Sequence, residues 1–302
     1  MESTWHQISK EISEHVARAG RAVVAVDGRA GHTSSGILWQ SNLVLTAAHT
    51  IRHDTDIRIV LEPGHSIRAK LAGRATGADV ALLRVDQEIG QATAEFADTA
   101  ALAVGELVVA IGRTRRGNIV ASAGILGGLM GEWTLSRTRI DQFIRPDLTL
   151  YPGFSGGALI GADGRILGMT TSGLHRGKPL TIPSSTLTRL ADELNRKGHV
   201  GSPYIGLVMQ PVQIPEGLQK KSGVPAGVGL LVMHVEAGGP ADIAGVLLGD
   251  LLVQLNGQSL DDLTDLQDVL RRAGIGENVS ATIIRGGQKQ DFTIKIGERP
   301  LR

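Results

Sequence analysis

Hydrophobic residues recur with a helical period at the start of the chain and in shorter, strand-like runs after it. Trp5, Ile8, Ile12 and Val16 follow one another at intervals of three and four positions. This spacing predicts an amphipathic helix within residues 1–20. We expect this helix to pack on the domain that follows it, and an oligomerisation arm is the alternative interpretation.

From residue 21 the period changes, and short apolar runs bounded by Gly, Asn, Asp or Pro predict β-strands. The first group of runs covers 22–26, 36–39, 43–46, 56–61, 67–71 and 80–85, and the second covers 107–111, 119–126, 139–144, 158–160 and 166–171. Two groups of about six short strands are typical of two small antiparallel barrels. The sequence therefore predicts a mostly β region.

A helix closes this region. Leu187 and the leucines three and seven positions later share one helical face, Ser184 or the serine after it is the predicted N-cap, and Gly198 is expected to end the helix. We therefore place the first large domain at residues 21–198 and a polar linker at residues 199–203.

Strands and helices alternate in the last third of the chain, which predicts an α+β domain at residues 204–297. Its predicted strands are 205–209, 230–235, 250–255, 279–284 and 292–296, its predicted helices are 240–244 and 263–272, and its predicted hairpin turns are Asn256-Gly257 and Gly286-Gly287.

Composition agrees with two globular domains. The chain has 302 residues, 42% of them hydrophobic and 20% charged, which is enough for two separate cores. The formal charge of +1 gives no basic excess for nucleic acid, so we expect no nucleic-acid partner. The absence of cysteine excludes disulfides, thiolate zinc sites and cysteine nucleophiles.

No segment of the chain has the pattern of a signal peptide or a membrane span. The first twenty residues carry charges throughout, and the most apolar stretch, residues 100–111, is short and contains Glu106. We expect a cytoplasmic location for the chain as it stands. A periplasmic location is expected instead if an export signal has been removed.

Three polar residues stand beside apolar strands in contexts that suit amide hydrolysis. His49 ends the segment LTAAH, Asp79 begins DVALLRV, and Ser155 lies in the glycine-dense segment PGFSGGAL. Hydrolysis of an amide requires a nucleophile, a base, a group that fixes the tautomer of that base, and donors for the oxyanion. Each residue alone has an ordinary explanation as a turn, cap or loop residue. Together, in this order, they favour a catalytic triad.

The segments TAAH, DVALL and GFSGGAL resemble the three catalytic segments of trypsin-like serine proteases. More narrowly, they resemble the HtrA/Deg group, in which a PDZ domain follows. The resemblance extends from about residue 21 to residue 296 and includes the segments SGIL, DGRILG and IPS. It implies a chymotrypsin-like double barrel without a cofactor, with His49 as general base, Asp79 as the residue that orients it, and Ser155 as nucleophile.

The glycines around the serine have a physical role in this interpretation. Backbone N–H groups of Gly153 and Ser155 would converge on the developing oxyanion, and a residue without Cβ lets the turn form. Phe154 departs from the family, in which asparagine or aspartate is usual. This departure motivates one alternative: a catalytically silent binding or chaperone protein with a protease fold.

Two other interpretations of these residues are less favoured. The segment GFSGG fits the G-x-S-x-G elbow of α/β-hydrolase esterases, but a strand and turn follow it, and the best Asp and His lie upstream. His49 and His53 are four positions apart, but no Glu follows the first, and a third metal ligand is not evident. We expect no metal.

The resemblance also locates a substrate pocket beside the serine turn. An uncharged base of this pocket would favour a small or medium aliphatic residue before the scissile bond, whereas a shift of register would bring Asp147 in as a cation-binding group. The residues that the resemblance places around the pocket are Thr149, Leu150, Met169, Thr170 and Thr171.

Residues 204–297 resemble a bacterial PDZ domain. Tyr204, Ile205, Gly206 and Leu207 look like its carboxylate-binding loop, so C-terminal or extended peptides are expected to add as a strand at a sheet edge. We therefore predict a serine endopeptidase that cleaves exposed or unfolded polypeptides, with peptide recognition or regulation by the PDZ domain. Family resemblance adds the expectation of a homo-oligomer, a trimer or larger.

Overall fold

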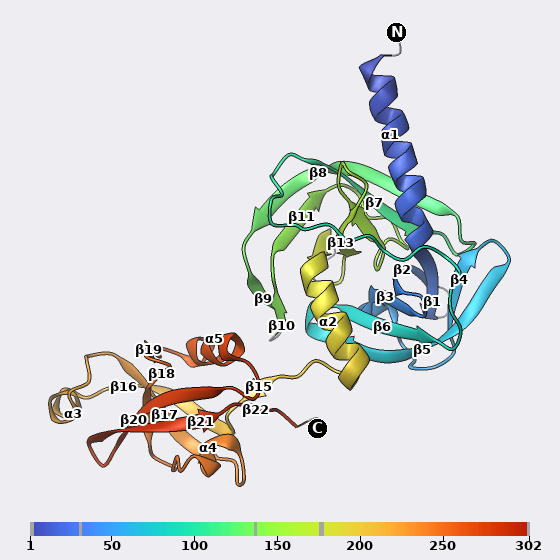
Figure 1. Cartoon of the computed structure of the whole chain (residues 1–302). Helices are drawn as coiled ribbons and strands as arrows, with labels where there is room; N and C mark the ends of the chain where they lie inside the picture. Colours follow the sequence, from blue (N-terminus) through green and yellow to red (C-terminus); the bar gives the residue numbers. More distant parts are fainter. Residues whose placement is uncertain (1–2, 30–31, 136–137, 175–177, 301–302) are drawn as a thin grey trace. The chain divides into compact units, whose positions relative to one another are not determined.

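A computed structural model describes residues 3–29, 32–135, 138–174 and 178–300 of the chain. The chain forms two compact units, Met1–Val200 and Gly201–Arg302. The first unit is built mainly from strands, with one helix at each end, and the second combines a sheet with short helices (Figure 1). Among the described residues, no helix combines the length and the apolar character that a membrane span requires.

Helix α1 (Thr4–Ala19) begins the first unit. The Ser3 side chain caps it by accepting a hydrogen bond from the backbone of His6. Ile12 and Val16 pack against the core, but Trp5 is 81% exposed. The helix therefore packs on the barrels through its C-terminal half, and its first turns stand clear of them (Figure 1). The 3-10 turn η1 (Gly20–Ala22) leads from α1 into the first strand.

Six antiparallel strands close the first barrel in the order β1-β2-β3-β6-β5-β4. Their side chains alternate between the barrel interior, with Leu38, Val44 and Ile59 fully buried, and a second core shared with the rest of the unit. The strands are β1 (Val23–Arg29), β2 (His32–Gln40), β3 (Leu43–Ala47), β4 (Ile57–Glu62), β5 (His65–Ala75) and β6 (Val80–Val85).

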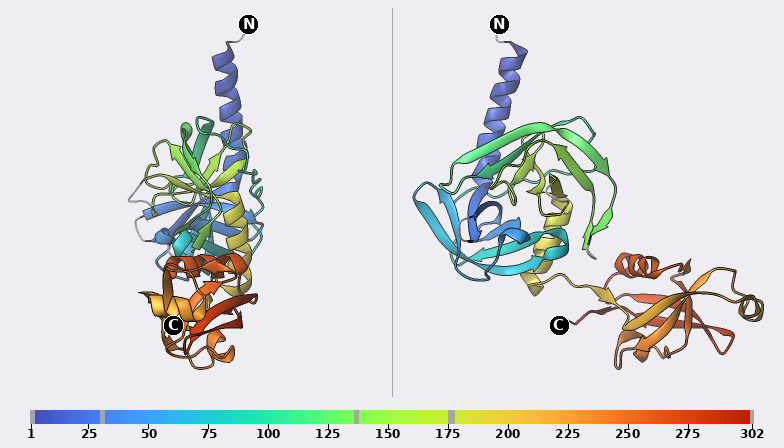
Figure 2. Two further views of the ribbon diagram at one scale, coloured as in Figure 1. Left: turned by 90° about the vertical axis from the view of Figure 1, so that its left-hand side faces the viewer. Right: turned by 180° about the vertical axis from the view of Figure 1, so that it is seen from behind.

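Six more strands close the second barrel in the order β11-β14-β13-β12-β7-β8. A pair of short strands, β9 (Trp133–Leu135) and β10 (Thr138–Ile140), stands beside it. The predicted mostly β fold with two antiparallel barrels is therefore confirmed (Figure 2). The barrel strands are β7 (Leu107–Arg113), β8 (Ile119–Met130), β11 (Phe143–Asp147), β12 (Ala158–Ile160), β13 (Ile166–Thr171) and β14 (Leu180–Pro183).

The prediction of one strand at 139–144 is wrong, because the chain breaks there between β10 and β11. At the break, the Asp141 backbone N–H donates to the hydroxyl of Thr186 at 2.9 Å instead of joining a strand ladder. The Asp141 carboxylate also accepts from Arg139. Strand β14 was not predicted, since its apolar run is too short before Pro183.

Helix α2 (Ser184–Lys197) closes the unit and contacts strands β5, β6, β13 and β14, so it touches both barrels. The predicted serine N-cap is wrong. Pro183 occupies the cap position, and the Ser184 hydroxyl donates to the carbonyl oxygen of Ala97 at 2.7 Å. Leu187 and the other leucines of its face are buried, and Gly198 ends the helix with a φ of +76°, as predicted.

The second unit is an antiparallel sheet in the order β16-β17-β18-β20-β21, with helix α5 along one face (Figures 1 and 2). Short pairs β15–β22 and β18–β19 complete it. Its elements are β15 (Pro203–Tyr204), β16 (Leu207–Gln213), α3 (Glu216–Ser222), β17 (Val228–Val235), α4 (Pro240–Ile243), β18 (Leu251–Leu255), β19 (Gln258–Ser259), α5 (Leu263–Ala273), β20 (Asn278–Arg285), β21 (Gln288–Lys295) and β22 (Gly297–Glu298).

Local turn chemistry in this unit follows the sequence closely. Both residues of the predicted hairpin turns Asn256-Gly257 and Gly286-Gly287 have positive φ, as a two-residue type I′ turn requires. Helix α3 was not predicted, because none of its residues is buried and it has no apolar stripe. The predicted strand at 205–209 begins later, since Ile205 and Gly206 form a bend before β16.

Candidate active site

His49 and Asp79 meet because their strands are paired. His49 lies in a 3-10 turn directly after β3, Asp79 lies directly before β6, and these strands pair antiparallel with Ala47 opposite Val80. The Asp79 carboxylate accepts from His49 twice, from the backbone N–H and from ring atom Nδ1, both at 2.8 Å. The Asp79 side chain is 5% exposed, while the His49 side chain is 40% exposed.

The carboxylate controls the protonation of the imidazole. Its hydrogen bond to Nδ1 raises the pKa of His49 above the ordinary value of 6.5, the charge of Asp79 adds to this effect, and burial opposes it. A carboxylate on Nδ1 keeps the proton of the neutral ring at Nδ1, which leaves Nε2 as the basic nitrogen. The pair therefore has the chemistry of an oriented general base.

The segment that follows β13 reaches the same pair. Thr171, the last residue of β13, donates its hydroxyl proton to Oδ2 of Asp79. A Cβ atom built on Gly173 would lie 2.6 Å from Nδ1 of His49 and 2.7 Å from Oδ2 of Asp79. Only a glycine fits at this position without displacing the imidazole.

The Ser155 hydroxyl contacts the middle residue of the same segment. It lies 3.1 Å from the hydroxyl of Ser172 and accepts a 3.4 Å hydrogen bond from the Ser172 backbone N–H. No hydrogen bond joins Ser155 to His49 within the described residues. A serine hydroxyl moves between staggered rotamers, and catalytic hydrogen bonds often tighten only with substrate bound. Residues 171–173 thus contact Asp79, Ser155 and His49 in turn.

The turn before Ser155 has a defined type. The Phe154 N–H donates to the carbonyl oxygen of Tyr151 at 3.1 Å, and Gly153 has a φ of +101°. Pro152 followed by a glycine with positive φ is the signature of a type II β-turn. The Phe154 ring is 2% exposed and packs in the core of the second barrel, so it does not occupy the solvent-facing side of the turn.

Hydrogen bonding around the turn leaves two N–H groups available. The N–H groups of Phe154, Gly156 and Gly157 donate to backbone carbonyl oxygens within the protein. Over the described part of the chain, those of Gly153 and Ser155 have no acceptor. Two unpaired N–H groups beside a serine hydroxyl are what an oxyanion hole requires.

The residues predicted for the substrate pocket have different surroundings. Met169 is fully buried in the core between the barrels, and the buried Thr170 hydroxyl donates to the carbonyl oxygen of Phe154 at 2.9 Å. Leu150 packs partly against the second barrel, and Thr149 is exposed. Thr171 bonds the Asp79 carboxylate, so residues 169–171 are occupied by contacts with the core, with the serine turn and with Asp79. The pocket itself stays a prediction.

The residues predicted to bind a peptide carboxylate surround the start of β16, which is an edge strand of its sheet. The carbonyl oxygens of Ile205 and Gly206 accept from Ala241 and Glu236, and Gly206 has a φ of +75°. In the described ranges, the N–H groups of Ile205 and Gly206 have no acceptor. Leu207 packs partly against the core, and Arg299 lies 5.8 Å from the ring of Tyr204.

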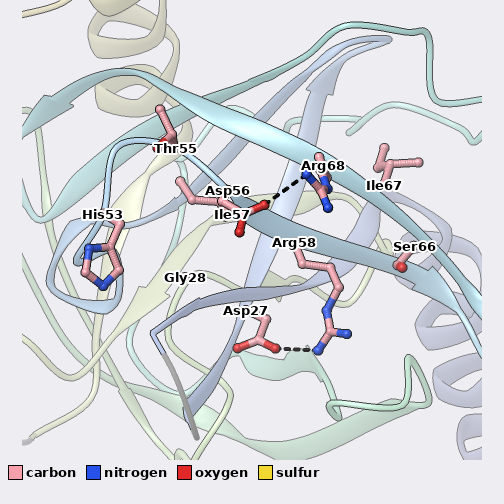
Figure 3. Close-up of a pocket in the computed structure, with 10 residues that line it drawn as sticks. All are labelled: Asp27, Gly28, His53, Thr55, Asp56, Ile57, Arg58, Ser66, Ile67 and Arg68. Atoms are coloured by element: carbon pink, nitrogen blue, oxygen red, sulfur yellow. Dashed lines mark hydrogen bonds and ion pairs between the residues drawn. The ribbon is translucent and has the colours of Figure 1, made fainter.

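A charged hollow of about 540 Å³ lies on the first barrel near His53 (Figure 3). Its carboxylates are already paired: Asp27 with Arg58 at 2.6 Å, and Asp56 with Arg68 at 3.5 Å. We therefore assign no ligand to this hollow. Across the residues that the structure describes, no three His, Asp or Glu side chains form a group that could hold a metal ion.

Comparison with known proteins gives two domain matches. The model of the trypsin-like peptidase domain matches residues 34–169, and the model of the PDZ domain matches residues 203–296. The solved structure of the HtrA-type protease AlgW with a tripeptide has a TM-score of 0.69 and is 26% identical, over 96% of this chain and 98% of that chain.

Curated relatives extend over nearly the whole chain. The putative serine protease HhoB of Synechocystis is 30% identical over 91% of this chain and 68% of the relative. The probable periplasmic serine endoprotease DegP-like of Halomonas elongata is 29% identical over 96% of this chain, which spans 63% of that relative's length. The two domain matches lie on the two barrels and on the second sheet. The chain therefore belongs to the HtrA/Deg family of trypsin-like serine proteases that carry a PDZ domain.

Proposed function

We propose that this protein is a serine endopeptidase with Ser155 as nucleophile, His49 as general base and Asp79 as the residue that orients the base. The observation that carries the proposal is that one short segment, residues 171–173, bonds Asp79 through Thr171 and Ser155 through Ser172, and leaves no room for a Cβ beside His49 at Gly173. Relatives named as a serine endoprotease and as a serine protease support it.

The geometry supports an acyl-enzyme mechanism. The Ser155 hydroxyl attacks the scissile carbonyl carbon while Nε2 of His49 takes its proton, and Asp79 stabilises the imidazolium through Nδ1. The N–H groups of Gly153 and Ser155 bind the oxyanion. His49 then protonates the leaving amine. Water, deprotonated by the same imidazole, hydrolyses the ester on Ser155.

We further propose that exposed or unfolded polypeptides are the substrates, with an aliphatic residue at the pocket around Thr149 and Leu150. The C-terminal carboxylate of a peptide would bind the unpaired N–H groups at Ile205 and Gly206, and its backbone would pair with the β16 edge. A homo-oligomer, trimeric or larger, is the assembly expected from the family. Relatives named as periplasmic support the periplasmic alternative for its location.

One observation weighs against the catalytically silent, chaperone-like alternative. That alternative was considered because Phe154 departs from the family. The Phe154 ring packs in the barrel core, and Gly153 keeps the positive φ of a type II turn, so Phe154 does not distort the turn. The esterase alternative requires a mostly parallel sheet, whereas both barrels are antiparallel.

Labelling of the full chain with a fluorophosphonate, followed by casein cleavage, tests the proposal. The wild type should label at Ser155, and Ser155→Ala should lose labelling and about 10⁶-fold in kcat. A folded wild-type protein that neither labels nor cleaves casein would leave the silent binding protein as the better interpretation. Cleavage that survives in Ser155→Ala would exclude Ser155 as nucleophile.

A further inference from the structure

A second serine, Ser35 on β2, is hydrogen-bonded to the catalytic turn on both sides of the nucleophile. Its hydroxyl donates to the carbonyl oxygen of Gly153 at 2.7 Å, and its backbone N–H donates to the carbonyl oxygen of Ser155 at 2.9 Å. Ser35 is fully buried and lies 118 residues before Gly153 in the chain. It therefore holds two separate peptide groups of one short turn.

The peptide groups that Ser35 holds alternate with those that carry the unpaired donors. Ser35 bonds the peptide between Gly153 and Phe154 and the peptide that follows Ser155. The two unpaired N–H groups belong to the peptide before Gly153 and to the peptide between Phe154 and Ser155. Because consecutive peptide planes share a Cα atom, fixing the alternate planes restricts the rotation of the two that carry the donors.

The direction of the Ser35 hydroxyl is itself determined. Its oxygen accepts the backbone N–H of Arg113 at 2.8 Å, so its single proton is available for the carbonyl of Gly153. A Cβ atom on Gly112 would lie 3.1 Å from this hydroxyl and 3.3 Å from Cα of Phe154, so the glycine leaves space for the hydroxyl at this position.

Arg113 is anchored in turn at the junction between α1 and β1. Arg113 is 8% exposed, and its guanidinium donates to the carbonyl oxygens of Gly20 at 2.8 Å and Val23 at 2.7 Å, and to that of Gly117. The end of β7, and with it the N–H that orients Ser35, is therefore tied to the start of the first barrel.

We propose that Ser35 is a positioning residue for the oxyanion turn: its hydroxyl holds the Gly153 carbonyl so that the Gly153 and Ser155 N–H groups converge on the substrate. The inference rests on the proposed endopeptidase function. Glycine at 153 has no Cβ to restrict its backbone, so the hydrogen bond from Ser35 adds to the bond between Phe154 and Tyr151 in keeping the turn in one conformation.

Kinetics of Ser35→Ala, with Ser34→Ala as matched control, test the proposal. Ser34 is also buried on β2, but its hydroxyl donates to Val26 and Thr50 within the first barrel. Loss of an oxyanion donor costs about 10²–10³-fold in kcat, so loss of its positioning should cost about 10–10²-fold, with KM within about twofold. Inhibition by a peptide aldehyde, which forms a tetrahedral adduct, should weaken by the same factor. Ser34→Ala should keep kcat within about twofold of the wild type.

The pH profile separates positioning from general destabilisation. Among the described residues Ser35 makes no hydrogen bond to His49 or Asp79, so the midpoint of the profile should be the same in Ser35→Ala and wild type. Unchanged kcat in Ser35→Ala, or an equal loss in Ser34→Ala, would overturn the proposal. If Ser35→Ala does not fold, Ser35→Cys keeps the volume with a weaker donor. That variant should lose part of kcat, and full activity in it would overturn the proposal too.

A readout without catalysis distinguishes failure of this inference from failure of the proposed function. ¹⁹F NMR of fluorophenylalanine at Phe154, recorded in Ser155→Ala, reports the conformation of the turn. Ser35→Ala should shift or broaden this resonance, and Ser34→Ala should leave it in place. If Ser35→Ala shifts the resonance but the wild-type protein shows no proteolysis, Ser35 still holds the turn and the proposed endopeptidase function is rejected. If the resonance does not move but the wild-type protein is proteolytically active, the role of Ser35 is rejected and the endopeptidase function stands.

Discussion

Replacement of Asp79 by asparagine should disable the base while keeping the fold. Asp79 has a φ of +56°, a left-handed conformation that asparagine also tolerates, and the two side chains have nearly the same size. In the native protein Oδ1 accepts from the His49 backbone, and Oδ2 accepts from Nδ1 of His49 and from the Thr171 hydroxyl. The asparagine side chain has a single oxygen. If this oxygen accepts from the His49 backbone N–H, as Oδ1 does, the NH₂ group takes the place of Oδ2 and faces Nδ1.

The rate should then fall, because the imidazole would adopt the wrong tautomer. An amide N–H that points at Nδ1 makes this nitrogen an acceptor and moves the imidazole proton to Nε2, which can no longer take the proton of Ser155. Loss of the correct tautomer costs about 10⁴-fold in kcat, or about 5 kcal/mol of transition-state stabilisation. The pKa of His49 should fall as well, since the hydrogen bond and charge that raise it are gone while the burial that lowers it remains.

The assay is kcat/KM on a fluorogenic peptide from about pH 5 to about pH 9, which reports the ionisation of the free enzyme. Wild-type activity should rise through a midpoint above the ordinary histidine value of 6.5, because the base must be neutral and its pKa is raised. Asp79→Asn should show a much lower plateau and a midpoint at lower pH.

A matched control and a refuting result complete the experiment. Asp163→Asn changes an exposed carboxylate bonded to Arg165 and should leave the profile unchanged. Thermal unfolding should show that both variants are folded. If folded Asp79→Asn keeps its rate within about tenfold of the wild type, or if the wild-type profile is flat, the assignment of His49 as an oriented base is refuted.

Two further predictions concern the glycine behind the imidazole and the PDZ domain. Gly173→Ala should lower kcat by about 10²-fold, because its Cβ would displace the His49 ring. The control is Gly90→Ala, which has open space around the new Cβ. Equal kcat values in the two variants would contradict the reasoning. A peptide with a free C-terminal carboxylate should bind the full-length Ser155→Ala protein in calorimetry. Amidation of the peptide C-terminus should weaken its affinity by about tenfold or more, because hydrogen bonds to the N–H groups near Gly206 are lost. Equal affinities of the two peptides would contradict carboxylate recognition.

Much of the strand pattern could be predicted, because each strand is a local apolar run between turn residues. The bounds of β6, β12 and β13 agree with the sequence prediction to the residue. The segment 139–144 could not be predicted, since its break depends on a hydrogen bond from Asp141 to Thr186, 45 positions away. Helix α3 was not predicted for a different reason: none of its residues is fully buried, so its sequence has no periodic apolar signal.

The functional residues divide in the same way. His49, Asp79 and Ser155 could be proposed from the few residues around each of them. Thr171 was named only as a pocket wall, and its hydrogen bond to Asp79 joins positions 92 apart. Ser35 belongs to the segment SGIL, which resembles the HtrA/Deg group, but nothing local indicates that its hydroxyl bonds Gly153.

The sequence by itself determined the order and type of most elements, the turns that need glycine or asparagine, and the residue types able to hydrolyse an amide. These depend on steric limits and burial preferences that act over a few neighbouring residues. Only the tertiary structure decided which N–H groups stay unpaired, which hydroxyl bonds the Gly153 carbonyl, and in which direction the pKa of His49 moves. Those properties arise from hydrogen bonds and desolvation by atoms that folding brings from distant parts of the chain.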